Sequence, residues 1–303
     1  MDSLKSMRMF ARVVELGSFS AAAREEGVGQ PAISKLISAL ERSLGVRLLE
    51  RTTTSLIPTE EGKRFYERSK GVIEEYDEAV ADTRGQTRLF TGMLRINAPI
   101  GLGELRLNSL FFEFLKKYPK IEVELILNDR VIDLVEEGVD VAIRLGDKLP
   151  PNVIARTITM SPRVLVASPG YLGQSRQIRH PRDLIKHEYI RFAGIGSGDQ
   201  LKFSMDEEKI TVSTKGRYRV NSSLALRQCF LEGIGLGTAP EWLVHDLVET
   251  NALVRLLPKW SLPGQALHLV YPSRRYQSLR TKALLQFMTE NIPNLPGFYT
   301  DAR

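Results

Sequence analysis

The chain has 303 residues, of which 43% are hydrophobic and 26% charged, with a formal net charge of +6. This length and composition are ordinary for a globular protein of two or three domains, and they exclude a disordered or fibrous chain. No apolar run approaches the roughly 18–20 residues that a membrane span needs, and charges at Asp2, Arg8, Arg12 and Glu15 argue against a signal peptide, so we expect a cytoplasmic protein.

The first 44 residues predict three helices, the last two of which form a helix-turn-helix. A helix is expected over residues 4–16, and Ser18 or Ser20 can cap a second one. Gly27-Val28-Gly29 supplies a turn, and Pro31 suits the start of a third helix because its first turn needs no backbone donor. Five aliphatic residues then recur at helical spacing and mark a buried face: Ile33, Leu36, Ile37, Leu40 and Leu44.

The other face of this third helix carries Gln30, Ser34, Lys35 and Ser38. Such side chains can hydrogen-bond base edges and phosphates from a helix that enters the major groove. The sequence therefore predicts that this helix reads double-stranded DNA.

Residues 46–57 are interpreted as a two-stranded wing, with its turn at 52–55 and with Arg47 and Arg51 on either side. The total charge does not locate a nucleic-acid site, because residues 1–90 hold 14 basic and 14 acidic residues. The DNA prediction therefore depends on local placement.

A long helix is expected from a cap at Thr59 to about Thr87. Its apolar stripe alternates by four and three residues, which is typical of a helix that packs against a partner helix. Packing against its own domain is the alternative, but two DNA readers need a fixed spacing, which favours dimerisation. The predicted dimer contacts are Phe65, Val72, Tyr76 and Ala79.

After a polar hinge at residues 85–92, strands and helices alternate, which predicts a mainly parallel sheet covered on both faces. The expected strands are 93–97, 121–127, 139–144, 164–167, 218–221, 234–238 and 268–271, with two more near Ile190 and Ile210. The expected helices are 102–118, 131–137, 181–185, 222–232 and 280–291.

Two segments of this half are similar, Arg95-Ile96-Asn97-Ala98-Pro99 and Arg219-Val220-Asn221-Ser222-Ser223. Each is interpreted as a strand end that leads into a helix. If both are structural, two helix N-termini face each other across a cleft, where their N–H groups favour an anion. Chance similarity over five residues is the alternative.

Several segments together resemble the LysR-type transcriptional regulators of bacteria over essentially the whole chain. They include SFSAAA, QPAISKLISALERSLGVRLLER, PTEEG, GMLRINAP, FLKKYPKIEVEL, VIDLVEEGVDVAIRLG and EGIGLGTAPEWL. The resemblance implies an α/β protein with an N-terminal winged helix-turn-helix, a long linker helix and a two-subdomain effector domain like the periplasmic binding proteins. The implied boundaries are 1–58 (helix-turn-helix core 18–38), 59–88 and 89–303, the last divided into subdomain I (92–163 and 268–303) and subdomain II (164–267).

The resemblance also assigns site residues by position. The DNA-binding set is Gln30, Pro31, Ala32, Ser34, Lys35, Ser38 and Arg51. The effector-binding set is Ala98, Pro99, Ile100, Gly101, Asn221, Ser222 and Pro240. At three positions the chain departs from the family pattern in ways that would weaken DNA binding: Gly29 replaces a capping serine, Glu26 replaces an apolar residue and is expected at the rim, and Thr54 replaces a basic residue.

The implied function is a sequence-specific regulator that bends promoter DNA as a homodimer or a dimer of dimers. A small organic co-inducer between the subdomains would modulate it, and Arg144, Arg191 and Arg217 favour an anionic one. RNA polymerase is a further partner if the regulator is an activator. A regulator that needs no ligand is the main alternative, and an apolar cleft with a few convergent donors would argue against it.

A solute-binding protein or an enzyme is a remote alternative, and no cofactor or metal is expected. His180, His187, His245 and His268 lack metal-ligand spacing. The glycines at 233, 235 and 237 do not complete a dinucleotide fingerprint, and a lone Cys229 excludes an internal disulfide and a cysteine-built metal site.

Overall fold

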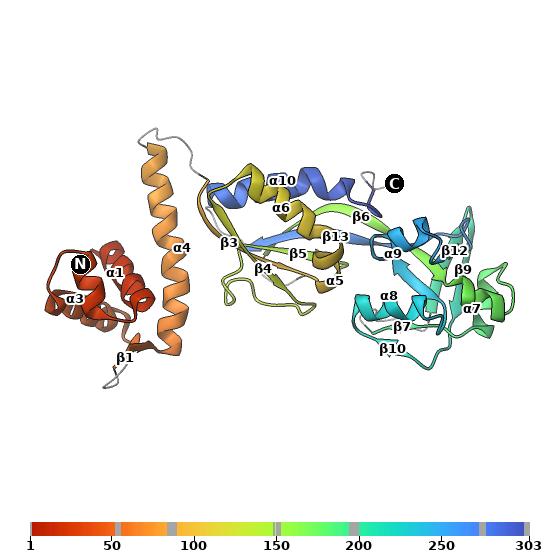
Figure 1. Cartoon of the computed structure of the whole chain (residues 1–303), viewed down its shortest axis with the longest axis horizontal. Helices are drawn as coiled ribbons and strands as arrows, with labels where there is room; N and C mark the ends of the chain where they lie inside the picture. Colours follow the sequence, from red (N-terminus) through yellow and green to blue (C-terminus); the bar gives the residue numbers. More distant parts are fainter. Residues whose placement is uncertain are drawn as a thin grey trace. The chain divides into compact units, whose positions relative to one another are not determined.

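A computed structural model describes residues 2–51, 56–83, 90–147, 149, 153–193, 200–272 and 277–299. The chain divides into two compact units (Figure 1). The N-terminal unit comprises residues 1–89 with 275–279, and the C-terminal unit comprises 90–274 with 280–303. Within the described ranges, no helix is both long and apolar enough to cross a membrane.

The N-terminal unit begins with three helices, α1 (Ser3–Leu16), α2 (Phe19–Glu25) and α3 (Gln30–Leu44). Ser18, and not Ser20, caps α2, since its hydroxyl accepts a hydrogen bond from the amide of Ala21 at 3.3 Å. Gly29 caps α3 without a side-chain hydrogen bond. The helix-turn-helix predicted from the sequence is confirmed.

The core of this unit contains Phe10, Val13, Ile33, Ile37 and Leu40. The prediction that Leu44 belongs to the same buried face is wrong, because its side chain is 41% exposed. Leu44 is the last residue of α3, and the chain turns away directly after it through Gly45, which has a φ of +71°.

Strands β1 (Leu49–Arg51) and β2 (Leu56–Pro58) pair antiparallel as the predicted wing. Its turn, with Thr54, lies outside the described residues. Helix α4 (Glu60–Thr83) follows, and the predicted end near Thr87 also lies outside them. Thr59 joins wing to helix, because its hydroxyl donates to the carbonyl of Arg47 at 2.8 Å and accepts from the amide of Gly62 at 2.9 Å.

One side of α4 packs on its own unit. Phe65 lies against Phe10 with ring centroids 5.5 Å apart, and Tyr66 donates its hydroxyl to Glu15 at 3.0 Å. The alternative of packing within the domain therefore holds for the first turns of α4. Further along, Val72 and Tyr76 are 46% and 51% exposed.

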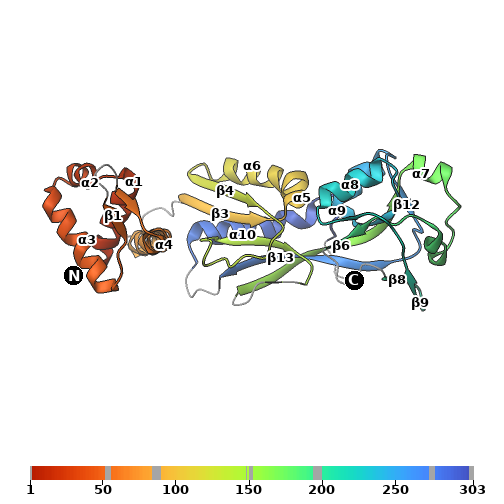
Figure 2. The ribbon, with the colours of Figure 1, turned by 90° about the horizontal axis from the view of Figure 1, so that it is seen from below.

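The C-terminal unit is built on a seven-stranded sheet with strand order β11-β6-β13-β5-β3-β4, in which β12 also pairs with β6. The strands are β3 (Gly92–Ala98), β4 (Ile121–Leu127), β5 (Val141–Leu145), β6 (Val153–Ala167), β11 (Gly237–Pro240), β12 (Val254–Leu256) and β13 (Leu262–Pro272). Figures 1 and 2 show two lobes joined by β6 and β13.

The prediction of a mainly parallel sheet is wrong, because the sheet is mixed. Only β3 pairs in parallel, with β4 and β5, whereas β6 and β13 run antiparallel to each other and to their other neighbours. The sequence indicated only 164–167 of β6 and 268–271 of β13. The first part of β6 is mostly exposed, so no apolar run marks it as a strand.

The first lobe adds α5 (Ile100–Leu102), a π-helical turn (Gly103–Leu107), α6 (Asn108–Lys117) and α10 (Leu279–Asn291), followed by a 3₁₀ turn (Ile292–Asn294). The helix predicted over 131–137 is instead a single turn. The Asp133 carboxylate accepts the amides of Val135 and Glu136 at 2.8 and 3.1 Å, and Gly138, with a φ of +63°, then ends the turn.

The second lobe combines short strands and helices around a core that includes Leu165, Tyr189, Phe203 and Trp260. Its elements besides β11 and β12 are α7 (Pro169–Gln174), a 3₁₀ turn (Pro181–Lys186), β7 (Arg191–Phe192), β8 (Gln200–Met205), β9 (Glu208–Ser213), β10 (Arg219–Val220), α8 (Ser223–Leu231) and α9 (Glu241–Glu249). The sequence indicated no strand at β8 and no helix at α7 or α9.

A close approach between α4 and the wing predicts the effect of a Gly62→Ala variant. A Cβ at Gly62 would collide with the backbone carbonyl of Leu48, which already accepts the amide of Thr59 at 3.0 Å. We expect a loss of about 1–3 kcal/mol in the free energy of unfolding of the N-terminal unit, measured by urea denaturation followed by circular dichroism.

Gly71→Ala is the matched control on the same helix, since a Cβ there meets no atom within 4 Å. Helix propensity alone should make this variant neutral or more stable, by up to about 1 kcal/mol. Equal effects of the two substitutions would contradict the proposed steric contact.

Candidate functional site

The first two turns of α3 form an accessible surface in the N-terminal unit. Gln30, Pro31, Ala32 and Lys35 are exposed there, while Ser34 and Ser38 are partly buried. Of the predicted DNA-binding set, only the side chain of Arg51, at the end of β1, lies outside the described residues.

Glu26 follows the last residue of α2 and is exposed, as its expected place at the rim requires. Its carboxylate therefore does not enter the small core between the helices, where a buried charge would cost several kcal/mol.

Glu41 is a positioning residue that the sequence analysis missed. Its carboxylate, on the third turn of α3, accepts the backbone amides of Leu48 at 2.8 Å and Leu49 at 3.2 Å. This side chain thereby fixes the start of the wing relative to α3. The sequence contained no signal for it, because a glutamate on a helix surface is usually solvated.

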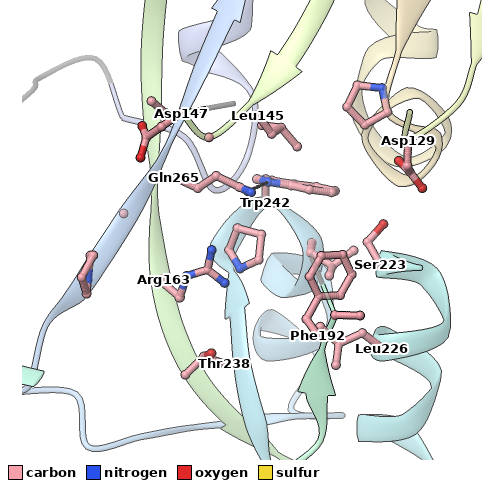
Figure 3. Close-up of a pocket in the computed structure, with 18 of the residues that line it drawn as sticks. Asp129, Leu145, Asp147, Arg163, Phe192, Ser223, Leu226, Thr238, Trp242 and Gln265 are labelled. Atoms are coloured by element: carbon pink, nitrogen blue, oxygen red, sulfur yellow. Dashed lines mark hydrogen bonds between the residues drawn. The ribbon is translucent and has the colours of Figure 1, made fainter. Parts of the chain in front are cut away.

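The C-terminal unit contains a cavity of about 890 Å³ between its lobes (Figure 3). Pro99 and Asp129 line it from the first lobe, Arg163 from β6, and Phe192 and Trp242 from the second lobe. Further lining residues are Asn128, Arg130, Val131, Arg144, Leu145, Asp147, Tyr189, Lys202, Asn221, Ser223, Leu226, Thr238, Pro240, Leu243 and Gln265.

Pro99, Asn221 and Pro240 of the predicted effector-binding set line this cavity. The other four are not among its lining residues. Ala98 is fully buried in the core, and the hydroxyl of Ser222 caps α8 by accepting the amide of Ala225 at 3.4 Å.

The remaining two, Ile100 and Gly101, lie where the starts of α5 and α8 meet. A Cβ at Gly101 would collide with the hydroxyl of Ser223, so the two similar segments do come together. The amide of Ile100, however, already donates to the carboxylate of Asp129 at 3.2 Å. The expectation that these helix N-termini offer free N–H groups to an anion therefore fails at α5.

Two arginines of the lining that are at least partly buried have no carboxylate bonded to them in the described part of the chain. Arg144 is buried, and its one described hydrogen bond runs to the carbonyl of Ile143 at 3.0 Å. Burial lowers the pKa of its guanidinium, which the nearby charge of Asp129 partly opposes.

Arg163, on β6, makes no side-chain hydrogen bond or ion pair with the described residues, and burial lowers the pKa of its guanidinium. The other arginines that the sequence put forward lie elsewhere. Arg191 is within 3.5 Å of the carbonyl of Thr214, and Arg217 is 92% exposed beside Glu188. The sequence contained no signal for Arg163, because the predicted strand began only at residue 164 and nothing marked the earlier part of β6.

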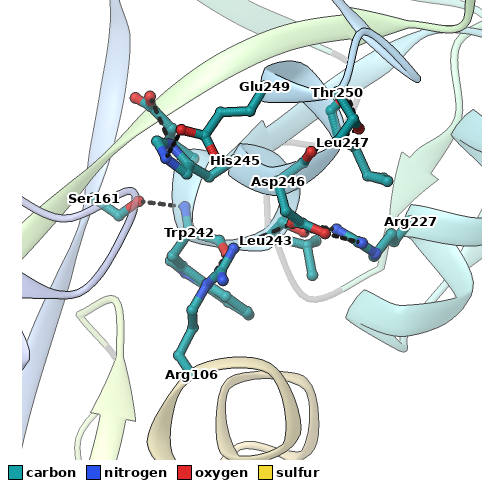
Figure 4. A network of polar contacts seen from close by, with 11 residues as sticks. Arg106, Ser161, Arg227, Trp242, Leu243, His245, Asp246, Leu247, Glu249 and Thr250 are labelled. Carbon is teal, nitrogen blue, oxygen red and sulfur yellow. Dashed lines mark hydrogen bonds and ion pairs between the residues drawn. The ribbon is translucent and has the colours of Figure 1, made fainter.

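Trp242 forms one wall of the cavity and is held by bonds from both sides (Figure 4). Its amide donates to Ser161 at 3.2 Å, its carbonyl accepts from the guanidinium of Arg106 at 2.8 Å, and its indole donates to Gln265 at 3.2 Å. Because Arg106 belongs to the first lobe and Trp242 to α9, the wall of the cavity is tied to both lobes.

One turn further along α9, Asp246 extends this connection. Its carboxylate accepts from Arg106 at 3.2 Å and from two nitrogens of Arg227, one of them at 2.9 Å. The bonds from Arg227 are the main reason why the pKa of Asp246 is lowered. The two arginines come from the π-helical turn and from α8, so a single carboxylate joins the lobes.

The lowered pKa of Asp246 predicts a pH-dependent contribution to stability. A carboxyl group whose pKa falls on folding stabilises the folded state above its unfolded pKa of about 3.9, and loses that effect as pH falls through the folded value. Asp246→Asn should therefore lower the thermal unfolding midpoint clearly at pH 7, and this deficit should shrink as the pH falls below about 3.9 and through the folded pKa.

Glu249→Gln is the control, since Glu249 lies on the same helix and, among the described residues, forms an ion pair with His245 alone at an exposed position. Its effect on the midpoint should be small at both values of pH. A deficit of Asp246→Asn that stayed the same from pH 7 to pH 3 would contradict the role of the ionised carboxylate.

Two family models match the chain. The bacterial regulatory helix-turn-helix protein of the lysR family matches residues 4–63, and the LysR substrate binding domain matches residues 87–293. The first covers helices α1 to α3, the wing and the first turn of α4, and the second covers both lobes.

Curated relatives and solved structures match over nearly the full length. The transcriptional regulator PtxR of Pseudomonas aeruginosa is 32% identical over 97% of this chain and 94% of its own, and DmlR of Escherichia coli is 32% identical over 96% of each. Among structures, CrgA of Neisseria meningitidis (TM-score 0.61) and AphB of Vibrio cholerae (TM-score 0.59) are each 28% identical and match over 95% of this chain and 98% of theirs. With helix-turn-helix, wing and two-lobed domain all present, the chain belongs to the LysR family of DNA-binding transcriptional regulators.

Proposed function

We propose that the protein binds promoter DNA as a dimer of dimers, and that a small anionic co-inducer in the cavity between the lobes changes how it bends that DNA. The observation that carries this proposal is the cavity itself, into which a half-buried arginine, Arg163, projects without an acidic partner among the described residues. The proposed division is a reader at 1–58, a linker at 59–88 and an effector domain at 89–303, whose subdomains, 92–163 with 268–303 and 164–267, meet at this cavity.

DNA recognition is assigned to the start of α3, with Gln30 and Lys35 reaching the major groove and Arg51 holding the backbone. The exposure of the first two supports this assignment. Glu41 supports it further, because it fixes the wing in register with α3 and so lets both contact one duplex. Gly29 in place of a capping serine costs only a few tenths of a kcal/mol.

Dimerisation is assigned to the outer part of α4. Phe65 packs against Phe10 of its own unit. In contrast, three apolar side chains further along the helix are exposed, those of Val72, Tyr76 and Ala79. Exposed apolar side chains at helical spacing favour a second helix as their partner.

The co-inducer is assigned to the cavity because its described lining has four basic residues and two acidic ones. The basic residues are Arg130, Arg144, Arg163 and Lys202, and the acidic ones are Asp129 and Asp147. A ligand changes DNA bending only if it binds two assembly states with different affinity, which the connection of Trp242 to both lobes allows. A regulator without a ligand would instead be expected to fill this space.

The relatives are named as transcriptional regulators, and this supports a role in DNA binding without catalysis. Because promoter DNA lies in the bacterial cytoplasm, the proposed function also places the protein in that compartment. If the protein activates transcription, RNA polymerase is the further partner.

The DNA assignment is tested by footprinting the upstream region of the regulator's own gene with the protein and with Lys35→Ala. Loss of a specific contact should cost about 1–3 kcal/mol, which is roughly 5- to 150-fold in affinity, and loss of a phosphate contact should reduce the salt slope by about one. Lys116→Ala removes the same charge from α6 in the other unit and should leave the footprint intact. Unchanged affinity and salt slope in Lys35→Ala would remove Lys35 from the interface.

The oligomer assignment is tested by sedimentation of Tyr76→Asp. A carboxylate at the centre of an apolar helix contact is left without a partner, so we expect a shift to lower mass and a loss of cooperative DNA binding. Tyr76→Phe keeps the ring and should retain the native assembly. An identical mass distribution for Tyr76→Asp would place the dimer contact elsewhere.

A further inference from the structure

We propose that the co-inducer is an organic monocarboxylate with a flat apolar body, whose carboxylate binds Arg163 and Thr238 and whose body lies between Trp242 and Phe192. This inference rests on the proposed function and names the chemical class of its ligand. It also makes Arg163 the residue that determines specificity.

The carboxylate end is defined by the pairing of β6 with β11. Arg163 lies opposite Pro240 in this ladder, so Thr238, two residues before Pro240, is its diagonal neighbour on the same face of the sheet. In Figure 3 the guanidinium group of Arg163 extends into the cavity toward Trp242, and Thr238 lies below it on the neighbouring strand. A guanidinium fork and a hydroxyl at this spacing are suited to the two oxygens of one carboxylate.

The hydroxyl groups of Tyr189 and Thr238 together leave one O–H donor available to a ligand. Tyr189 and Thr238 share one hydrogen bond at 2.7 Å between their hydroxyls, and the Tyr189 oxygen also accepts the amide of Thr238 at 3.2 Å. Whichever hydroxyl donates in that pair, the O–H of the other stays available. Both residues line the cavity, so this second donor can face the same ligand oxygen as Arg163.

The opposite part of the cavity wall is apolar. Trp242 and Phe192 face the open space in Figure 3, and Leu226 lies next to Phe192. Leu145 and Leu243 extend the apolar lining. Because the bonds to Ser161, Arg106 and Gln265 hold Trp242 in place, its ring is a preformed flat wall that favours an apolar, preferably planar, ligand body.

The far end of the cavity disfavours a second carboxylate. Asp129 and Asp147 line the cavity from the first lobe, and the charge of Asp129 already acts on Arg144. Arg163 thus differs from the buried Arg144, because no carboxylate among the described residues acts on its charge. One anionic group on the ligand satisfies Arg163, whereas a second would meet two aspartates.

The experiment measures binding of four probes to the full-length protein by calorimetry: phenylacetate, its neutral amide phenylacetamide, acetate and succinate. Phenylacetate should bind at least tenfold more tightly than each of the others, because only it combines one carboxylate with a flat body. Arg163→Met should weaken phenylacetate binding by about 10- to 100-fold, whereas Arg217→Met, which removes an exposed arginine outside the cavity lining, should leave it unchanged.

A second readout needs no ligand. If the role of Arg163 is to bind a ligand, its charge is uncompensated in the ligand-free protein, so Arg163→Met should raise the thermal unfolding midpoint. A lower midpoint would show that Arg163 supports the fold instead, and would overturn the proposal. So would binding of none of the four probes, equal binding of succinate or phenylacetamide, or tight phenylacetate binding to Arg163→Met.

The failure of this inference is separable from that of the proposed function. A footprint that depends on Lys35, together with no preference for phenylacetate, would retain the DNA-binding regulator and reject the ligand class. Loss of both would reject both.

Discussion

The antiparallel pairing of β6 with β13 is the constraint on which the rest of the C-terminal unit depends. These two strands, of 15 and 11 residues, run through both lobes, so a single ladder fixes the distance between them. The cavity lies beside this ladder, with Arg163 on β6 and Gln265 on β13 among its lining. Because the lobes share two strands, a ligand bound between them would contact both.

Polar connections complete this arrangement where the ladder ends. The carboxylate of Asp246 accepts hydrogen bonds from Arg106 of the first lobe and from Arg227 of the second. Arg106 also donates a hydrogen bond to the carbonyl of Trp242. The wall that a ligand would touch is thus bonded to the residues that hold the lobes together. Arg163 has the opposite character. No carboxylate in the described part of the chain pairs with this half-buried guanidinium, a cost in stability that is typical of a site prepared for a ligand.

The N-terminal unit shows how much local sequence can determine. The turn at Gly27-Val28-Gly29, the cap at Thr59 and the spacing of Ile33, Ile37 and Leu40 predicted helices whose bounds the structure reproduces closely. These signals depend on residues within one or two helical turns of each other, and can therefore be recognised in a single sequence. The contacts of Glu41 with the wing and of Gly62 with Leu48 were not predictable, because each joins residues brought together only by the packed fold.

The sequence by itself determined the family, helix α3 and the wing, because motifs and helical periodicity are local properties of the chain. The family resemblance added three residues of the cavity, Pro99, Asn221 and Pro240. Only the tertiary structure decided that the sheet is mixed, that Phe65 packs on its own unit and that Arg163 faces the cavity. The half of β6 that carries Thr157 and Thr159 is largely exposed, so no apolar run in the sequence indicated a strand there. The direction of an arginine on such a strand is set by its partners across the ladder, which lie about 75 to 100 residues away in sequence.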